Sequence, residues 1–220
     1  MRLIYSPGAC SISIHLVLEE LGVYFDTQQI LARRGEAQSE TFREINPKGK
    51  VPVLILDDGT VLTETPVILQ YLAEIYPKHG LLPAGTATKY EVLQLCEYLS
   101  NNVHNFGLTR IFRPQLFCKS EDNWEVIRAE GTKVLLDAFD IIASMFRANF
   151  MFGAFSIADA SLFFFELHAR RLHIAMPAIL EAHLDRLIER PSIRRTIRRE
   201  GLASAEFRIG ILPRARRDPA

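Results

Sequence analysis

Hydrophobic positions in the first part of the chain change between strand spacing and helix spacing. Residues 2–5 are mostly apolar, which is typical of a short buried strand. After a loop with Pro7 and Gly8, apolar residues recur at helical spacing from Ser11 until Gly22, at Ile14, Val17, Leu18 and Leu21. We therefore predict a strand, a loop and a helix that Gly22 ends.

The next fifty residues predict a second strand, a hairpin and another helix. Residues 25–31 have strand character, and a short helical stretch begins at Ser39 and ends at 46–49. Asp-Asp-Gly at 57–59 separates two apolar runs, which is a strong hairpin signal. Pro66 suits a first helical position, and helical spacing then continues to Ile75, before Pro77. The predicted order is βαβ, a short helical segment, then ββα.

Strand signals largely vanish after residue 85. Residues 77–85 are rich in proline and glycine, which predicts a linker. Helical spacing then covers 87–106, 122–146, 157–172, 178–190 and 192–199. The predicted fold class is α/β plus all-α. We predict an α/β domain at 1–79, an all-helical domain at 86–203 and an arginine-rich tail at 204–220 whose order the sequence does not fix.

Composition and charge narrow the class of protein. The chain carries 26 basic and 26 acidic residues, so no overall field favours nucleic acid or an anionic membrane. Three scattered cysteines without a CxxC pair favour a reducing compartment. The start of the chain leaves no room for a signal-peptide core, and the apolar run 160–165 is too short to span a bilayer. We expect a cytoplasmic protein with no nucleic-acid or membrane partner. The six histidines are scattered, so we expect no metal site.

Cys10 is the first candidate for chemistry, because it stands between the first strand and the first helix. Helix N-termini expose unpaired N–H groups and the positive end of the helix dipole, and both lower the pKa of a nearby thiol. They would equally stabilise the thiolate of a bound ligand, whereas a packing role is the plainer alternative. Ser11 is expected to cap the helix, and its hydroxyl could also donate to a sulfur.

Three further positions could belong to a ligand site. Val51-Pro52 directly precedes a strand, where a cis bond would expose the Val51 backbone. Glu64 and Thr65 precede a helix, where they could hold the ammonium and carboxylate of an amino-acid head group, or Thr65 could only cap the helix. His104 is either structural or a neutral donor or acceptor, and the asparagines around it could interrupt the helix.

Other motifs are interpreted as structural. Ser156-Ile157-Ala158-Asp159 matches a capping box with Asp at the fourth position, so replacing Asp159 should harm folding more than catalysis. Arg33-Arg34 is a surface pair by default and a carboxylate clamp only in a suitable setting. The tail arginines (Arg208, Arg214, Arg216 and Arg217) are solvated or contact a surface anion.

Four segments in order give the chain a family resemblance. They are residues 7–11 (PGACS), 46–52 (NPKGKVP), 62–65 (LTET) and 155–160 (FSIADA). This order and spacing resemble the cytosolic glutathione S-transferases. The start of the chain, with residues 108–114 (LTRIFRP), is most similar to the bacterial beta class. The match covers roughly residues 1–202.

The resemblance implies a thioredoxin-like domain joined to a helical domain, assembled as a homodimer. It implies glutathione as co-substrate, conjugated to a small hydrophobic electrophile in detoxification. It further implies a cis Val51-Pro52 peptide, a catalytic group of Cys10, Ser11 and His104 at the glutathione sulfur, and a glutathione-binding set: Arg33, Arg34, Lys50, Val51, Pro52, Glu64 and Thr65. The choice between the two arginines for the glycyl carboxylate stays open.

Two other functions remain compatible with these residues. Cys10 could exchange disulfides through a mixed disulfide with glutathione, which would then also be the resolving thiol because the chain has no CxxC. The same fold could instead serve as a non-catalytic binding protein. A non-catalytic scaffold has no need of Cys10, Glu64-Thr65 and His104, so these residues favour the two enzyme hypotheses.

Overall fold

The computed structural model describes residues 1–84 and 87–202, and its first part is built on a four-stranded sheet. The strand order is β2 (Asp26–Gln29), β1 (Arg2–Tyr5), β3 (Val53–Ile55), β4 (Val61–Thr63). β1 is parallel to β2 and antiparallel to β3, and β3 pairs with β4 as the predicted hairpin. The predicted strands are confirmed with slightly different ends. The arginine-rich tail at 204–220 lies outside the described residues.

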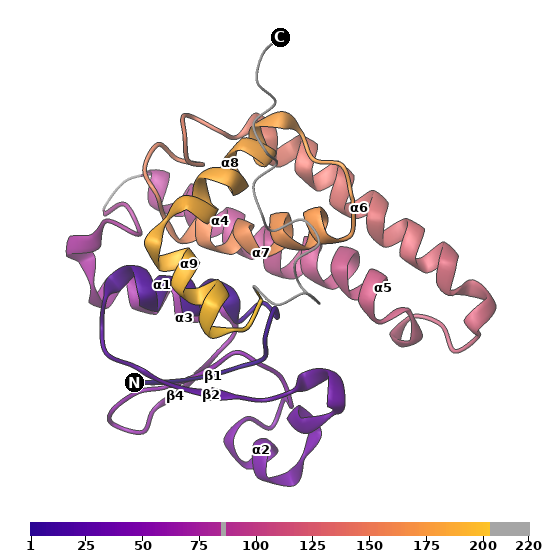
Figure 1. Ribbon diagram of the computed structural model, residues 1–220, viewed down its shortest axis with the longest axis horizontal. Helices are drawn as coiled ribbons and strands as arrows, with labels where there is room; N and C mark the ends of the chain where they lie inside the picture. Colours follow the sequence, from indigo (N-terminus) through magenta and orange to yellow (C-terminus); the bar gives the residue numbers. More distant parts are fainter. Residues whose placement is uncertain (85–86, 203–220) are drawn as a thin grey trace.

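Three helices accompany the sheet. α1 (Ile12–Leu21) and α3 (Thr65–Ile75) lie on the side that faces the remaining helices, and α2 (Glu40–Ile45) lies on the other side (Figure 1). Gly22 ends α1 in the left-handed conformation, as its position predicted. Ser39 caps α2, because its hydroxyl oxygen accepts a hydrogen bond from the Phe42 amide.

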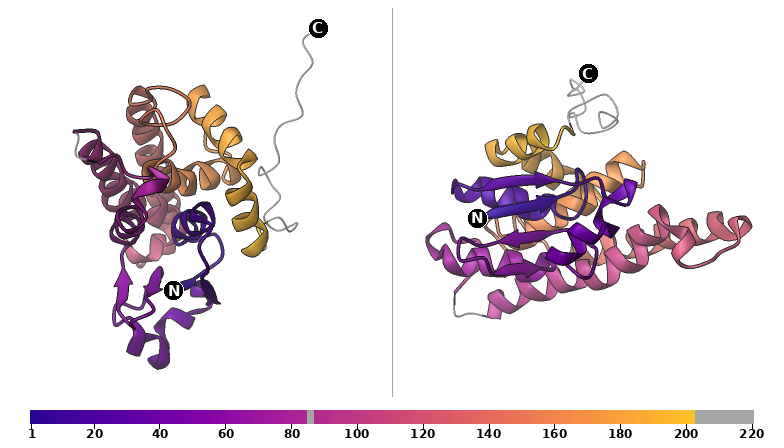
Figure 2. Two further views of the ribbon diagram at one scale, coloured as in Figure 1. Left: turned by 90° about the vertical axis from the view of Figure 1, so that its left-hand side faces the viewer. Right: turned by 90° about the horizontal axis from the view of Figure 1, so that it is seen from below.

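The rest of the described chain is almost wholly helical, which confirms the predicted fold class. Its main elements are α4 (Ala87–Tyr98), η4 (Leu99–Leu108), α5 (Thr109–Phe112), α6 (Trp124–Ser144), α7 (Ile157–Arg171), α8 (Ala178–Glu189) and α9 (Pro191–Arg199). The chain then returns to the sheet layer, since α9 packs along α1 (Figure 2). None of the described helices is both long and apolar enough to cross a membrane.

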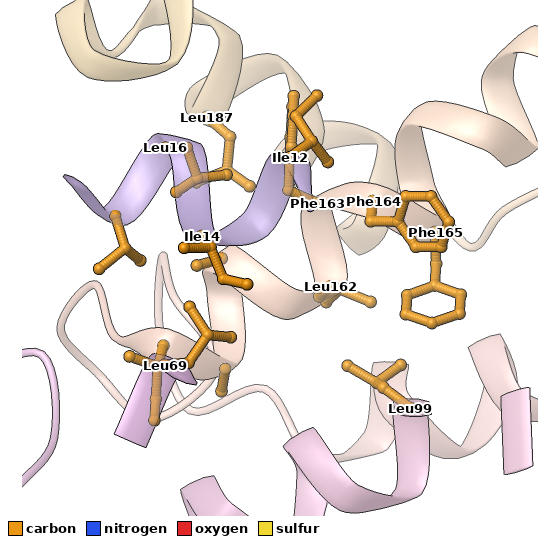
Figure 3. Packing of buried hydrophobic residues seen from close by; sticks show 14 of the residues in the cluster. Ile12, Ile14, Leu16, Leu69, Leu99, Leu162, Phe163, Phe164, Phe165 and Leu187 are labelled. Atoms are coloured by element: carbon orange, nitrogen blue, oxygen red, sulfur yellow. The ribbon is translucent and has the colours of Figure 1, made fainter. Parts of the chain in front are cut away.

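One apolar core joins the two layers. Side chains of α1, α3, α7, α8 and η4 converge on it, as Figure 3 shows for ten labelled residues from Ile12 to Leu187. Ile12, Ile14 and Leu16 of α1 are completely buried. At about 25 cal/mol per Å² of apolar surface, each such side chain stabilises the fold by about 1.5–3 kcal/mol. The short helix α1 is therefore held from both sides, which fixes the place where it begins.

The segment around His104 corrects one expectation. The asparagines at 101, 102 and 105 do not interrupt the helix, because α4 widens into the π-helical segment η4 and continues into α5. Gly107 of η4 meets Gly131 of α6 so closely that a Cβ on Gly131 would lie 2.7 Å from the Gly107 carbonyl oxygen. This close approach fixes η4 against α6, and with it the height of His104 in the bundle.

Asp159 organises the centre of the helical part, and the predicted capping box is confirmed. One Asp159 oxygen accepts from the amide and the hydroxyl of Ser156, both at 2.8 Å. The other accepts from the Met151 amide at 2.9 Å and lies 3.1 Å from His183 Nε2. His183 Nδ1 lies 2.8 Å from Glu166 Oε1, and all three of these ionisable side chains are fully buried. Sequence reasoning found the capping box but not its link to α8.

This buried network makes stability depend on pH. Burial alone would lower the pKa of His183, but the Glu166 charge and the hydrogen bonds that the ring donates to both carboxylates outweigh it and raise the pKa to about 9. The charged His183 therefore stabilises the fold fully below its unfolded-state pKa of about 6.5, and this contribution is lost as pH rises through about 9.

Between roughly pH 7 and pH 10, we expect the free energy of unfolding to fall more in wild type than in His183→Gln. The difference between the two falls should be up to about 3 kcal/mol. Urea unfolding at several pH values measures it. Parallel pH profiles for the two proteins would contradict a charged His183.

Candidate active site

Cys10 stands in the loop between β1 and α1, facing a cis peptide. The Val51–Pro52 bond is cis, as the resemblance implied. The Cys10 Sγ donates a hydrogen bond to the Val51 carbonyl oxygen at 3.8 Å. The start of α1 and the start of β3 thus meet at one point, which brings together two residues forty-one positions apart.

A small cavity of about 20 Å³ connects Cys10 to the helical part of the chain. It joins three residues that the sequence had singled out separately, namely Cys10, Thr65 and His104. The other lining residues are Ser13, Pro66, Cys96, Leu99, Ser100, Ser161, Phe164 and Phe165. Helical spacing alone does not show which buried side chains of α7 border a cavity.

The ionisation of Cys10 corrects a sequence expectation. We predicted that the helix terminus would lower the pKa of this thiol. Burial instead raises the pKa, and it outweighs a hydrogen bond from Thr65 and those from the backbone amides of Cys10 and Ser11. The thiol therefore stays protonated at neutral pH, in agreement with its role as donor to the Val51 carbonyl.

His104 faces this cavity as a neutral ring. Burial, followed by the charges of Lys50 and Arg113, lowers its pKa to about 4. Its ring makes edge contacts with Phe164 at 5.5 Å and Phe165 at 6.4 Å between centroids. A pKa this low leaves the ring uncharged at neutral pH, and its role as donor or acceptor stays a prediction.

Ser11 occupies the N-cap position of α1 as predicted, but its side chain does not accept a hydrogen bond from the first turn, so that part of the prediction is wrong. Its hydroxyl donates to the Ser6 carbonyl oxygen and accepts from the Ser6 amide, both at 3.3 Å. The side chain is completely buried. In this arrangement, Ser11 holds the turn that carries Cys10 while its backbone amide points to the Cys10 sulfur.

Glu64 occupies the residue before α3 in a left-handed conformation, with φ at 70°. Its carboxylate is exposed and accepts a hydrogen bond from Lys48 Nζ at 2.6 Å. Thr65 is the first residue of α3 and does not cap it, because the cap position belongs to Glu64 and no side chain caps this helix. The Thr65 hydroxyl turns instead toward Cys10.

The remaining basic candidates lie at the borders of this region. Arg33 and Arg34 are exposed and line an open groove of about 520 Å³ together with Arg198 and Arg199 of α9. This groove adjoins Ser6 and Pro7 and is distinct from the Cys10 cavity. Lys50 is exposed beside Val51.

The Gly8 peptide ties the Cys10 loop to the helical part. Its amide donates to Glu200 Oε2 at 2.8 Å, and its carbonyl accepts from His168 Nε2 at 2.8 Å. Burial lowers the pKa of His168 to about 3, so the donor is a neutral ring. Glu200 also lies 2.9 Å from His15 Nδ1. Sequence reasoning missed these contacts, which join residues far apart in the chain.

The part of the chain that the structure describes contains no set of side chains that could bind a metal ion. No group of three His, Cys, Asp or Glu side chains within 1–84 and 87–202 could hold a metal ion. The polar groups of the site are a thiol, hydroxyls, a neutral imidazole, backbone amides and peripheral charges.

The mixed four-stranded sheet with this thiol and cis-proline forms a thioredoxin-like domain, and a helical domain packs on its α1. The family model for the glutathione S-transferase N-terminal domain matches residues 8–75. Glutathione S-transferase GstA of Escherichia coli O157:H7 is 33% identical over 207 residues, covering 92% of this chain and all of that protein. The chain therefore belongs to the glutathione S-transferase family, and it is an enzyme of that family.

Solved structures agree with this assignment. A beta-class glutathione S-transferase from Sphingomonas chungbukensis superposes with a TM-score of 0.77 at 31% identity, over 92% of this chain and 100% of that one. A sphingomonad glutathione S-transferase complexed with glutathione gives a TM-score of 0.77 at 30% identity, with the same coverage. Glutathione is thus bound by a relative of the same architecture.

Proposed function

We propose that this chain is a beta-class glutathione transferase that conjugates glutathione to small electrophiles at the Cys10 cavity. The observation that carries the proposal is the convergence of Cys10, Thr65 and His104 on one cavity beside the cis Val51–Pro52 peptide. These residues come from both halves of the chain. Their order matches the beta-class pattern, and a beta-class structure shares the fold.

Glutathione would lie along the face between β3, α3 and the Cys10 loop. Glu64 would hold the γ-glutamyl ammonium, and Thr65 with the first α3 amides would hold its carboxylate, because a helix N-terminus favours an anion. The Val51 backbone would pair with the cysteinyl unit. Lys50, with Arg33 or Arg34, would meet the glycyl carboxylate as exposed cations.

The glutathione sulfur would then lie between Cys10 and His104. A neutral imidazole can accept the thiol proton, and the backbone amides at the start of α1 can donate to the thiolate. Lowering a thiol pKa by two units requires about 2.7 kcal/mol of preferential thiolate stabilisation. A helix terminus with one or two hydrogen bonds to the charged sulfur supplies an energy of that size. Ser11 contributes by holding the turn and its amide.

The thiolate would attack a small hydrophobic electrophile on the aromatic side of the cavity. Phe164 and Phe165 form that side. A homodimer is proposed as the working assembly because the family resemblance implies one.

Cys10→Ala separates transfer from disulfide exchange. Transfer uses the thiolate of glutathione itself, so it should survive the substitution at least in part. Exchange requires the Cys10 sulfur for a mixed disulfide, so it should vanish. Initial rates with a chlorodinitrobenzene and with a small mixed disulfide measure the two activities in wild type and variant.

Cys118→Ala is the control, because that cysteine lies outside the Cys10 cavity. Complete loss of transfer in folded Cys10→Ala would show that the Cys10 sulfur is required for the conjugation step, contrary to the proposal.

A further inference from the structure

Aromatic rings continue from the Cys10 cavity to the protein surface. Phe164, which lines the cavity, lies 5.5 Å from His104 and 4.7 Å from His168 between ring centroids. Phe112 lies 5.1 Å from His168 on the other side and is 40% exposed. These rings, which we call the aromatic wall (Phe112, His168, Phe164, Phe165 and His104), lead from the proposed sulfur position to the end of α5.

Arg113 stands directly after the exposed end of this wall. It is exposed, and within the described residues its guanidinium has no hydrogen bond or ion pair with a protein group. Its charge nevertheless reaches His104, since it contributes to lowering the pKa of that ring. Lys50 acts on His104 in the same way from the sheet side.

The neighbouring arginine is arranged differently. Arg110 lies over the rings of Phe106 and Phe117, 5.3 and 4.8 Å from their centroids. Its Nη1 also donates to the Phe106 carbonyl oxygen at 2.8 Å. Arg110 is therefore engaged by its own helix, whereas Arg113 has no such partner among the described residues and directly follows the exposed ring of Phe112.

We propose that the preferred electrophile is an aromatic carboxylic acid, whose ring lies on the aromatic wall and whose carboxylate pairs with Arg113. This inference rests on the proposed function and names the substrate class of the same site. The planar guanidinium suits a bidentate pair with a carboxylate. Lys50 does not serve the electrophile, because it adjoins Val51 on the sheet side, where it is proposed to contact glutathione.

The reaction with an aryl chloride is balanced without an oxidant or reductant. The glutathione thiolate forms a carbon–sulfur bond at the ring carbon that carries chlorine, and the carbon–chlorine bond breaks to release chloride. The thiol proton leaves to solvent by way of His104. The carboxylate on the far side of the ring takes no part in bond making and serves only to orient the ring.

The test uses a matched pair of substrates, a chlorodinitrobenzoate with its carboxylate para to chlorine and the methyl ester of the same acid. Initial rates at saturating glutathione give kcat/KM for each, corrected for the uncatalysed rate. We expect wild type to favour the acid by about tenfold or more, as for a charge-assisted bidentate pair. Arg113→Gln should abolish this preference by raising KM for the acid far more than KM for the ester.

Arg110→Gln is the matched control, because it removes the same charge three positions earlier from a side chain that is held by its own helix. It should keep the wild-type preference for the acid over the ester. The acid preference of wild type should also shrink as salt is raised. An unchanged acid-to-ester ratio in Arg113→Gln, or the same loss in Arg110→Gln, overturns the inference. Glutathione binding without turnover of either compound overturns it too, whereas absence of glutathione binding, measured by calorimetry, overturns the proposed function itself.

Discussion

Asp159→Ala is expected to lower the free energy of unfolding by about 3–5 kcal/mol, the loss typical of breaking a buried charge network. The side chain is fully buried and receives hydrogen bonds from the Ser156 amide and hydroxyl and the Met151 amide. Its removal leaves those donors without acceptors and leaves His183 with one carboxylate instead of two. Each buried unsatisfied group costs about 1–3 kcal/mol.

Urea unfolding followed by circular dichroism measures the loss. Asp137→Ala is the control, because Asp137 is exposed and pairs with Lys133 one helical turn away. Asp137→Ala should lower the free energy of unfolding by less than about 1 kcal/mol. Activity per folded molecule should stay close to wild type in both variants, since neither residue lines the cavity. If the free energy of unfolding falls no more in Asp159→Ala than in Asp137→Ala, the Asp159 network does not stabilise the fold.

Glu64→Gln is expected to weaken glutathione binding by about tenfold or more, or about 1.4 kcal/mol. The substitution keeps the size of the side chain and removes the charge proposed to hold the γ-glutamyl ammonium. Glu64 is already exposed and its backbone holds a left-handed conformation, so the amide variant is safer for folding than alanine. Isothermal titration calorimetry with reduced thiols measures the affinity.

Glu74→Gln provides the comparison at the far end of the same helix, where the carboxylate pairs with Lys89. Its affinity for glutathione should equal that of wild type. The two variants lose the same charge, so the distance from the start of α3 is what separates them. Equal affinities in all three proteins would place the γ-glutamyl group elsewhere.

Features set by local sequence were predictable. Gly22 ends α1 because glycine readily adopts the left-handed conformation, and Asp-Asp-Gly at 57–59 turns the hairpin for a similar reason. The capping box at Ser156 is another short-range pattern. Each depends on a few consecutive residues, so no knowledge of the fold was needed.

Features that depend on burial and distant contacts were not predictable in the same way. The helix terminus argued for a low Cys10 pKa, but the enclosing side chains come from elements that the Cys10 motif does not contain. The π-helical segment that carries His104 packs closely against α6 at Gly131, twenty-seven positions later. Glu200 meets Gly8 across almost the whole chain.

That last contact bears on how such an enzyme can be recombined. The loop that presents Cys10 is fastened through both polar groups of the Gly8 peptide to residues of the helical half. A chimera that grafts this sheet domain onto the helices of a relative must therefore bring equivalents of His168 and Glu200, or its reactive loop loses two of its anchors. The predicted linker at 77–85 is therefore a poor boundary for recombination, because the first strand and its loop have to be inherited together with α7, which carries His168, and with the end of α9, where Glu200 lies.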